Sequence, residues 1–220
     1  MMLMRHFSHA LGTAIVLVAG SVALLSGRAT AAPCAPGSPT TTNCTLTGTA
    51  ALTAGTLTLA APASLAWATT LNGLNQSLAD TTAADQQYTV NDATGSGAGW
   101  HVTTSATTFT NGTHTFPDSG TFVTNGSTSL ITGTTGPTAT CSGTCTLPTN
   151  SITYPVAITT AATTPTPVTI YNAAAASGLG AVVIGGSTAA NPVGWWVNVP
   201  ASASSGSYTS TITMAIISGP

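Results

Sequence analysis

The chain has 220 residues, a formal net charge of −2 and only 3% charged residues. It contains no Lys and no Glu, and its four acidic residues are all Asp. We expect no nucleic-acid partner, because binding to phosphates needs clustered Lys or Arg, and an anionic membrane surface is disfavoured for the same reason. The prevalence of Thr, Ala, Ser and Gly, with 43% hydrophobic residues, favours a β structure rich in turns.

The first 31 residues have the three parts of a secretory signal peptide. Arg5 lies in a short polar start, residues 10–25 form an apolar run, and Ala29-Thr30-Ala31 provides a cleavage site of small residues. The apolar run is short for a membrane span, so an uncleaved anchor is the weaker interpretation. We expect a secreted, extracellular protein at the cell surface, without membrane contact after cleavage.

The four cysteines are predicted to form disulfides, because such bonds persist outside the cell. They are Cys34, Cys44, Cys141 and Cys145. Four cysteines allow three pairings, and the local pairs 34–44 and 141–145 need the fewest assumptions. The alternative is a metal site that also uses a histidine, but the spacing of Cys141 and Cys145 is not that of zinc sites. We therefore expect no bound metal and no cofactor.

Residues 32–45, rich in Pro and Thr, are predicted to be an extended linker, and residues 46–220 to form one domain. The turn signals of this domain recur about every ten residues, which is typical of an antiparallel β-sandwich of Ig-like class. Strands are expected around residues 56–59, 86–92, 100–109, 116, 122–124, 129–132, 152–159 and 167–172. Residues 133–145 are expected to be a loop, and the Gly-rich residues 173–186 a loop or one helical turn.

Two long hairpins are predicted, one in the middle of the domain and one at its end. The first joins residues 86–92 to residues 100–109 through a Gly-rich turn. The second joins residues 193–199 to residues 207–218 around a small polar turn. In the last strand apolar residues alternate with Thr, which predicts one buried face and one exposed threonine face.

These two hairpins resemble the two signatures of the WxL-domain family of Gram-positive surface proteins. The segment from Val90 to Val102 contains Val-Asn-Asp, a Gly-rich turn and Gly-Trp-His-Val, and the C-terminal hairpin contains Val-Asn-Val-Pro and Gly-Ser-Tyr-Thr. The resemblance covers residues 46–220, and Met214-Ala215-Ile216 stands where the family has its second Trp-x-Leu. It implies a WxL-like β-sandwich that attaches non-covalently to the cell wall, through peptidoglycan, often beside other surface proteins.

The candidate binding residues are Trp196, Trp100 and Asn198. In an extended strand Trp195 and Val197 share one face, which is expected to be the inner one. Trp196 then faces outward beside Asn198, where it could contact a ligand or a partner. Trp100 lies on a mostly apolar strand face, so packing in the core is favoured over stacking on a sugar.

No catalytic activity is expected. His101 or His114 could act as a general base beside Asp92 or Asp118, but the chain has neither a Gly-x-Ser-x-Gly elbow nor a His-x-x-x-His pair. These four side chains are interpreted as residues of solvated turns, with Asp92 capping backbone amides. The leading hypothesis is therefore a non-catalytic, wall-associated protein that serves in adhesion or surface coating. The alternative is a structural subunit that self-assembles edge to edge, and an extracellular hydrolase comes third.

Overall fold

The computed structural model describes residues 48–220. By its internal contacts the chain divides into two units, residues 1–51 and 52–220, and the fold below is that of the second. The predicted signal peptide, the linker and the pair of Cys34 and Cys44 lie outside the described residues. Within residues 48–220 no helix is present that has the length and apolarity to cross a bilayer.

The described residues form eleven strands in three antiparallel sheets, so the predicted all-β sandwich is confirmed. The first sheet has the order β1-β3-β9-β6, with β1 Leu57–Ala60, β3 Gln87–Asp92, β9 Gly180–Gly185 and β6 Ala139–Cys141. The second has the order β2-β10-β5-β7, with β2 Gln76–Ala79, β10 Gly194–Val199, β5 Phe122–Asn125 and β7 Val156–Ile158. The third has the order β11-β4-β8, with β11 Ile212–Ser218, β4 Trp100–Ala106 and β8 Val168–Ala173.

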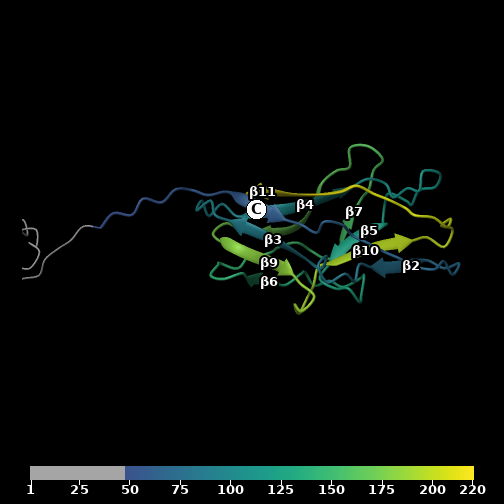
Figure 1. The fold of residues 1–220 in the computed structure, drawn as a ribbon, viewed down its shortest axis with the longest axis horizontal. Helices are drawn as coiled ribbons and strands as arrows, with labels where there is room; N and C mark the ends of the chain where they lie inside the picture. Colours follow the sequence, from purple (N-terminus) through teal and green to yellow (C-terminus); the bar gives the residue numbers. More distant parts are fainter. Residues whose placement is uncertain (1–47) are drawn as a thin grey trace, which may run out of the picture. The chain divides into compact units, whose positions relative to one another are not determined.

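The three sheets enclose one core of apolar and aromatic side chains. In Figure 1, β3, β9 and β6 lie toward one end of the ribbon, and β2, β10 and β5 lie toward the other. Strand β3 shows how the pattern positions the chain, because Tyr88 and Val90 are buried while Gln87 and Asn91 are exposed. By contrast, β4 and β10 are buried on nearly all of their length, since other elements cover both of their faces.

Both predicted hairpins are wrong, although most of their strands exist. Strand β3 pairs with β1 and β9, while β4 pairs with β11 and β8 in another sheet. Likewise β10 pairs with β2 and β5, while β11 pairs with β4. Each turn therefore connects two sheets across the sandwich instead of closing a ladder. The physical reason is burial, because strands that belong to different sheets can bury their apolar side chains against each other in the shared core.

Three strands lie in segments that were not predicted to be strands. Residues 173–186 were expected to be a loop or helical turn, but they contain β9, in the middle of the first sheet. Its glycines mark its end: Gly185 has a φ of 78°, and a side chain there would meet the backbone of Gln86. The predicted loop 133–145 contains β6, and the polar stretch before β3 contains β2. Residues 129–132 form turns instead of the predicted strand.

The predicted two-sided character of the last strand is confirmed. The side chains of Ile212, Met214 and Ile216 are partly buried against the core, while Thr213 and Ala215 are exposed. Strand β11 lies at the edge of its sheet, and its ladder with β4 runs from Ile212 to Ser218 without a register shift. This edge is important for the inference drawn below.

Candidate functional site

Trp196 was predicted to face outward, and this orientation is wrong. Its side chain is only 5% exposed, because β10 lies between β2 and β5 and both of its faces are covered. The indole N–H donates to Asn125 Oδ1 at 3.1 Å and to the carbonyl oxygen of Ser127 at 2.8 Å. The backbone of Ser127 can lie this close to β10 only because residue 194 is a glycine. Any side chain there would collide with the Ser127 carbonyl. Buried and hydrogen-bonded in this way, Trp196 offers no surface to a ligand.

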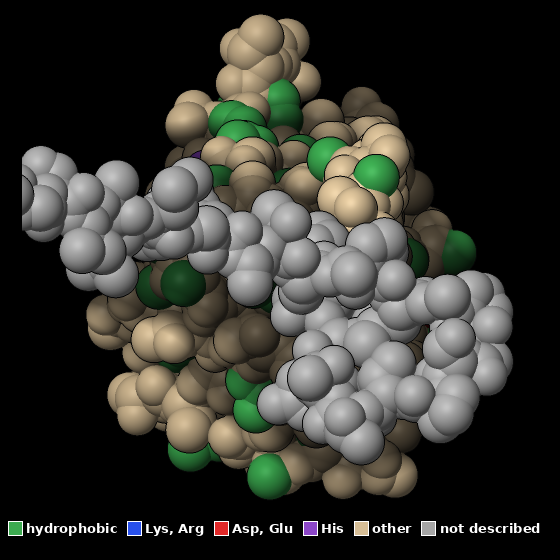
Figure 2. All heavy atoms as spheres, turned by 90° about the vertical axis from the view of Figure 1, so that its left-hand side faces the viewer, with side chains coloured by type: hydrophobic (Ala, Val, Ile, Leu, Met, Phe, Trp, Pro, Cys, Tyr) green, Lys and Arg blue, Asp and Glu red, His purple; other side chains and the backbone are tan. Residues whose placement is uncertain are grey.

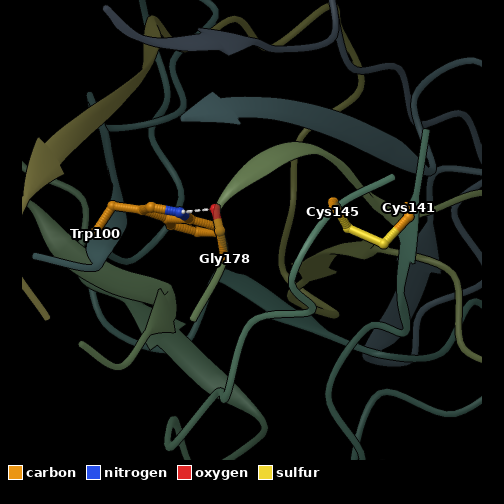
Figure 3. The surroundings of a disulfide bond; sticks show 4 residues. All are labelled: Trp100, Cys141, Cys145 and Gly178. Carbon is orange, nitrogen blue, oxygen red and sulfur yellow. Dashed lines mark hydrogen bonds between the residues drawn. A yellow bond between two sulfur atoms is a disulfide. The ribbon is translucent and has the colours of Figure 1, made fainter. Parts of the chain in front are cut away.

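Trp100 lies in the core, as favoured from the sequence. It is fully buried, stacks on Tyr171 with ring centroids 6.1 Å apart, and donates its indole N–H to the carbonyl oxygen of Gly178 at 2.9 Å. Figure 3 shows this indole pointing at Gly178, in the same region as the disulfide. Burial also raises the pKa of the Tyr171 hydroxyl to about 12. The surroundings of Trp100 are thus part of the packed core and are closed to solvent.

Asn198 is partly buried, and its amide is used inside the protein. Its Oδ1 accepts from the hydroxyl of Ser77 on β2, and its Nδ2 donates to the carbonyl oxygen of Gly120 at 2.7 Å. The side chain therefore ties β10 to β2 and to the turn before β5. Of the three candidate binding residues, two are core residues and the third holds strands together, and the structure does not bring them together at one exposed place.

Cys141 and Cys145 form a disulfide, as predicted, with their Cα atoms 5.5 Å apart. The bond closes the turn that follows β6 (Figure 3). Backbone bonds on both sides hold this turn against the β9 region, from Ser142 to Ala181 and from Thr146 to Leu179. The role is structural. Within residues 48–220 no group of three or more metal-ligating side chains is found.

The histidines and aspartates considered for general-base chemistry do not pair with one another in the described residues. Asp92 Oδ1 accepts from the amide and hydroxyl of Thr94, which is the predicted capping of a turn. Asp118 Oδ1 accepts from the hydroxyls of Thr108 and Thr160. His101 Nδ1 lies 2.7 Å from the carbonyl oxygen of Gly219. Asp92, Asp118 and His101 thus each have a hydrogen-bond partner within the fold, while His114 takes part through its backbone groups.

Asp80 and Asp85 form a buried carboxyl pair that was not predicted from the sequence. Asp80 is fully buried, and its two oxygens accept from the amides of Ala66 and Thr82. Burial, and next the charge of Asp80 and a hydrogen bond to it, raise the pKa of Asp85 above its ordinary value of 3.8. Asp80 thus fastens the segment around Ala66 to the residues that follow β2, which is a structural role.

Several exposed hollows occur among the described residues, and the two with the most aromatic lining lie where the segment 61–71 faces the segment 203–214. Two hollows adjoin there and share Trp67, Phe109 and Tyr208. We name them the Leu71 hollow, of about 670 Å³, and the Met214 hollow, of about 450 Å³. The Leu71 hollow is lined chiefly by Trp67, Thr69, Leu71, Leu78, Val199, Ser204, Ser207 and Tyr208. The Met214 hollow is lined chiefly by Pro62, Leu65, Trp67, Ile212 and Met214.

Trp67 forms the wall between the two hollows and is held firmly. Its indole N–H donates to the carbonyl oxygen of Trp195 at 3.0 Å, and its ring meets Phe109 and Phe122 edge to face. Tyr208 stacks on Phe116 with centroids 4.0 Å apart and donates its hydroxyl to the carbonyl oxygen of Ser204. The hollows therefore have rigid aromatic walls and flanks of Ser and Thr, and no charged residue lines either of them.

Comparison with known proteins identifies no relative: no family model, no curated protein and no solved structure matches this chain. The resemblance to the WxL family therefore stays a prediction from the sequence. Trp67 and Tyr208, which line both hollows, were not among the candidate residues predicted from the sequence. One signal was present, because Trp67 lies beyond β1 and Pro62 in a segment that shows no strand-like alternation.

Proposed function

We propose that this protein is a secreted, non-catalytic surface protein that binds neutral glycan strands of the cell wall in the Leu71 hollow. The observation that carries the proposal is the character of that hollow: it is open, aromatic on its walls, hydroxyl-rich on its flanks and uncharged. Its volume lies in the range of about 300–1,000 Å³ that is usual for small-ligand sites.

The chemistry of a neutral sugar fits this lining. A sugar ring presents C–H faces that pack on aromatic rings, and hydroxyl groups that exchange hydrogen bonds with Ser and Thr side chains. Tyr208 and Trp67 supply the apolar surface, and Thr69, Ser204 and Ser207 lie around it. An anionic polymer would find no cationic partner there, so the glycan backbone of peptidoglycan is a better match than acidic wall polymers.

The face of the protein that Figure 2 shows supports the same proposal. On the face drawn in Figure 2, the described side chains are mostly uncharged, with scattered hydrophobic groups and no Lys, Arg, Asp or Glu in view. Polymer binding by such a surface relies on packing and neutral hydrogen bonds, and it should therefore persist at high salt. The WxL-like segments of the sequence point to the same kind of partner, beside other surface proteins.

The test is co-sedimentation of the purified protein with insoluble peptidoglycan, with and without high salt. Leu71 is 41% exposed in the hollow, so Leu71→Asp adds a charge there without opening the core. We expect about a tenfold loss of affinity for this variant. The matched control is Leu130→Asp, because Leu130 is 56% exposed and lies outside both hollows. Binding of Leu71→Asp at the level of the parent would refute the site.

A further inference from the structure

One edge of the third sheet has no ladder partner among the described residues, although β1 lies close to it. Among the described residues β11 pairs only with β4. The amide of Thr107 donates to the carbonyl of Thr211, and the amide of Gly219 donates to that of Gly99, so odd-numbered residues of β11 bond to β4. In an antiparallel ladder the alternate residues point the other way. The residues whose amide and carbonyl groups face the open edge are Ile212, Met214, Ile216 and Ser218.

This edge lacks the features that protect edge strands in soluble proteins. Such strands usually carry Lys, a proline or a bulge, or they are very short. Strand β11 has no charged residue and no proline, and its ladder with β4 is regular over its whole length. On its inner side it borders the Met214 hollow, which is lined by Ile212 and Met214. The edge therefore offers free hydrogen-bonding groups beside an apolar space.

The chain also contains a segment suited to fill such a place. Residues 48–54, Gly-Thr-Ala-Ala-Leu-Thr-Ala, form no strand, and all of them are exposed. Leu52 is 94% exposed, an unfavourable position for a large apolar side chain. The first attachment to the sandwich comes at Gly55, whose amide donates to the carbonyl oxygen of Ala93. We call residues 48–54 the arm. None of them belongs to a strand within the same copy.

The pattern of the arm matches the two sides of β11. In an extended strand Ala50, Leu52 and Ala54 lie on one side, and Thr49, Ala51 and Thr53 lie on the other. Strand β11 has Ile212 and Met214 on its inner side and Thr213 and Ala215 on its outer side. An arm added with its leucine inward would direct Leu52 into the Met214 hollow and continue the outer surface of Thr and Ala.

We propose that residues 48–54 of one copy add as a strand to the open edge of β11 in a second copy. Each copy has one arm and one edge, and these are different surfaces, so the contact is heterologous and repeats head to tail. The product is a linear chain of copies. It leaves the Leu71 hollow, on the other side of Trp67, free for a wall ligand.

Sedimentation velocity of the mature protein over a range of concentrations tests the proposal. The arm variant is Leu52→Asp, and the edge variant is Thr213→Lys with Ala215→Lys, both on the exposed side of β11. We expect the parent to form oligomers, and each variant to raise the concentration needed for assembly about tenfold or more. Leu147→Asp is the control, because Leu147 is 52% exposed and belongs to neither surface.

Mixing the two variants gives a sharper result. The arm variant keeps a working edge and the edge variant keeps a working arm, so the mixture should form dimers of one copy of each and nothing longer. Circular dichroism checks that both variants are folded. If the edge variant is unfolded, the sedimentation of the arm variant Leu52→Asp tests the proposal without it. A parent that stays monomeric at every concentration, or a Leu52→Asp variant that assembles like the parent, would overturn the proposal.

Discussion

Trp196 on β10 and Asn125 on β5 are joined by a hydrogen bond of 3.1 Å between the indole nitrogen and the amide oxygen. Asn125 in turn donates to the carbonyl oxygens of Leu130 and Ile131, each at 2.9 Å. One buried amide thus connects a tryptophan to the loop after β5. The relationship explains why the most conspicuous aromatic candidate in the sequence has a structural role.

Replacing Trp196 by Phe should lower stability and leave wall binding unchanged. The variant keeps most of the apolar contact but leaves the buried carbonyl of Ser127 without this donor, which costs about 1–3 kcal/mol. Urea unfolding measures the loss, and Trp196→Ala should show a larger one, about 3–5 kcal/mol. If folded Trp196→Phe loses affinity for peptidoglycan at unchanged stability, the tryptophan contacts the ligand after all.

Thr104→Val should raise the free energy of unfolding by about 1 kcal/mol. Thr104 is fully buried in β4, and its hydroxyl has no hydrogen-bond partner among the described residues. Valine has a similar shape and removes the unpaired polar atom. Thr160→Val is the matched control, because that buried hydroxyl donates to Asp118 at 2.8 Å and its loss should be destabilising. Equal effects of the two variants in thermal unfolding would contradict this reasoning.

Removing the disulfide after β6 should lower the free energy of unfolding only modestly. The bond joins residues only four apart in sequence, so the entropy it removes from the unfolded chain corresponds to about 2 kcal/mol. The double variant Cys141→Ser with Cys145→Ser is therefore expected to fold and to unfold at lower urea. Because backbone bonds to Ala181 and Leu179 remain, hydrogen exchange should quicken in the turn and spare β4.

The buried pair of Asp80 and Asp85 should make stability depend on pH. The pKa of Asp85 is raised in the folded protein, so its contribution to stability is complete below about pH 3.8, its ordinary value, and is lost as pH rises through the folded-state pKa. Asp85→Asn removes the charge and keeps a hydrogen-bond donor for Asp80. The variant should therefore be more stable than the parent at neutral pH.

Urea unfolding of the parent and of Asp85→Asn across this pH range is the measurement. The gap in free energy of unfolding should shrink as pH falls, because the parent regains its proton. Asp118→Asn is the control, since Asp118 accepts hydrogen bonds from Thr108 and Thr160 and has no carboxyl partner. A gap that is constant with pH would show that the Asp85 charge is not the cause.

Alternation in the sequence predicted individual strands well and their partners poorly. Strands β1, β3 and β11 were predictable because their apolar residues fall on one side, and β4 because its β-branched residues cluster. Pairing is different, since it depends on which faces meet in the core. Strand β9 was missed because glycines flank a short apolar run, a pattern that periodicity cannot separate from a loop.

The candidate site was less predictable than the fold. Assigning Trp196 to the outside assumed that a strand has one solvent face, which fails for a strand covered on both sides. The hollows are built by the segments 61–71 and 203–214, which lie far apart in sequence and meet only in the folded protein. The arm was equally hidden, because nothing in its composition distinguishes it from the strand that follows.

Each of the three sheets contains one strand from the last part of the chain. Strand β9 is inside the first sheet, β10 is inside the second, and β11 completes the third. Until residues 180–218 have been synthesised, every sheet lacks a member, so the growing chain can finish none of them. Such non-local pairing predicts slow folding, on the order of milliseconds to seconds. The nascent chain can therefore complete its sheets only after its last strands have been synthesised.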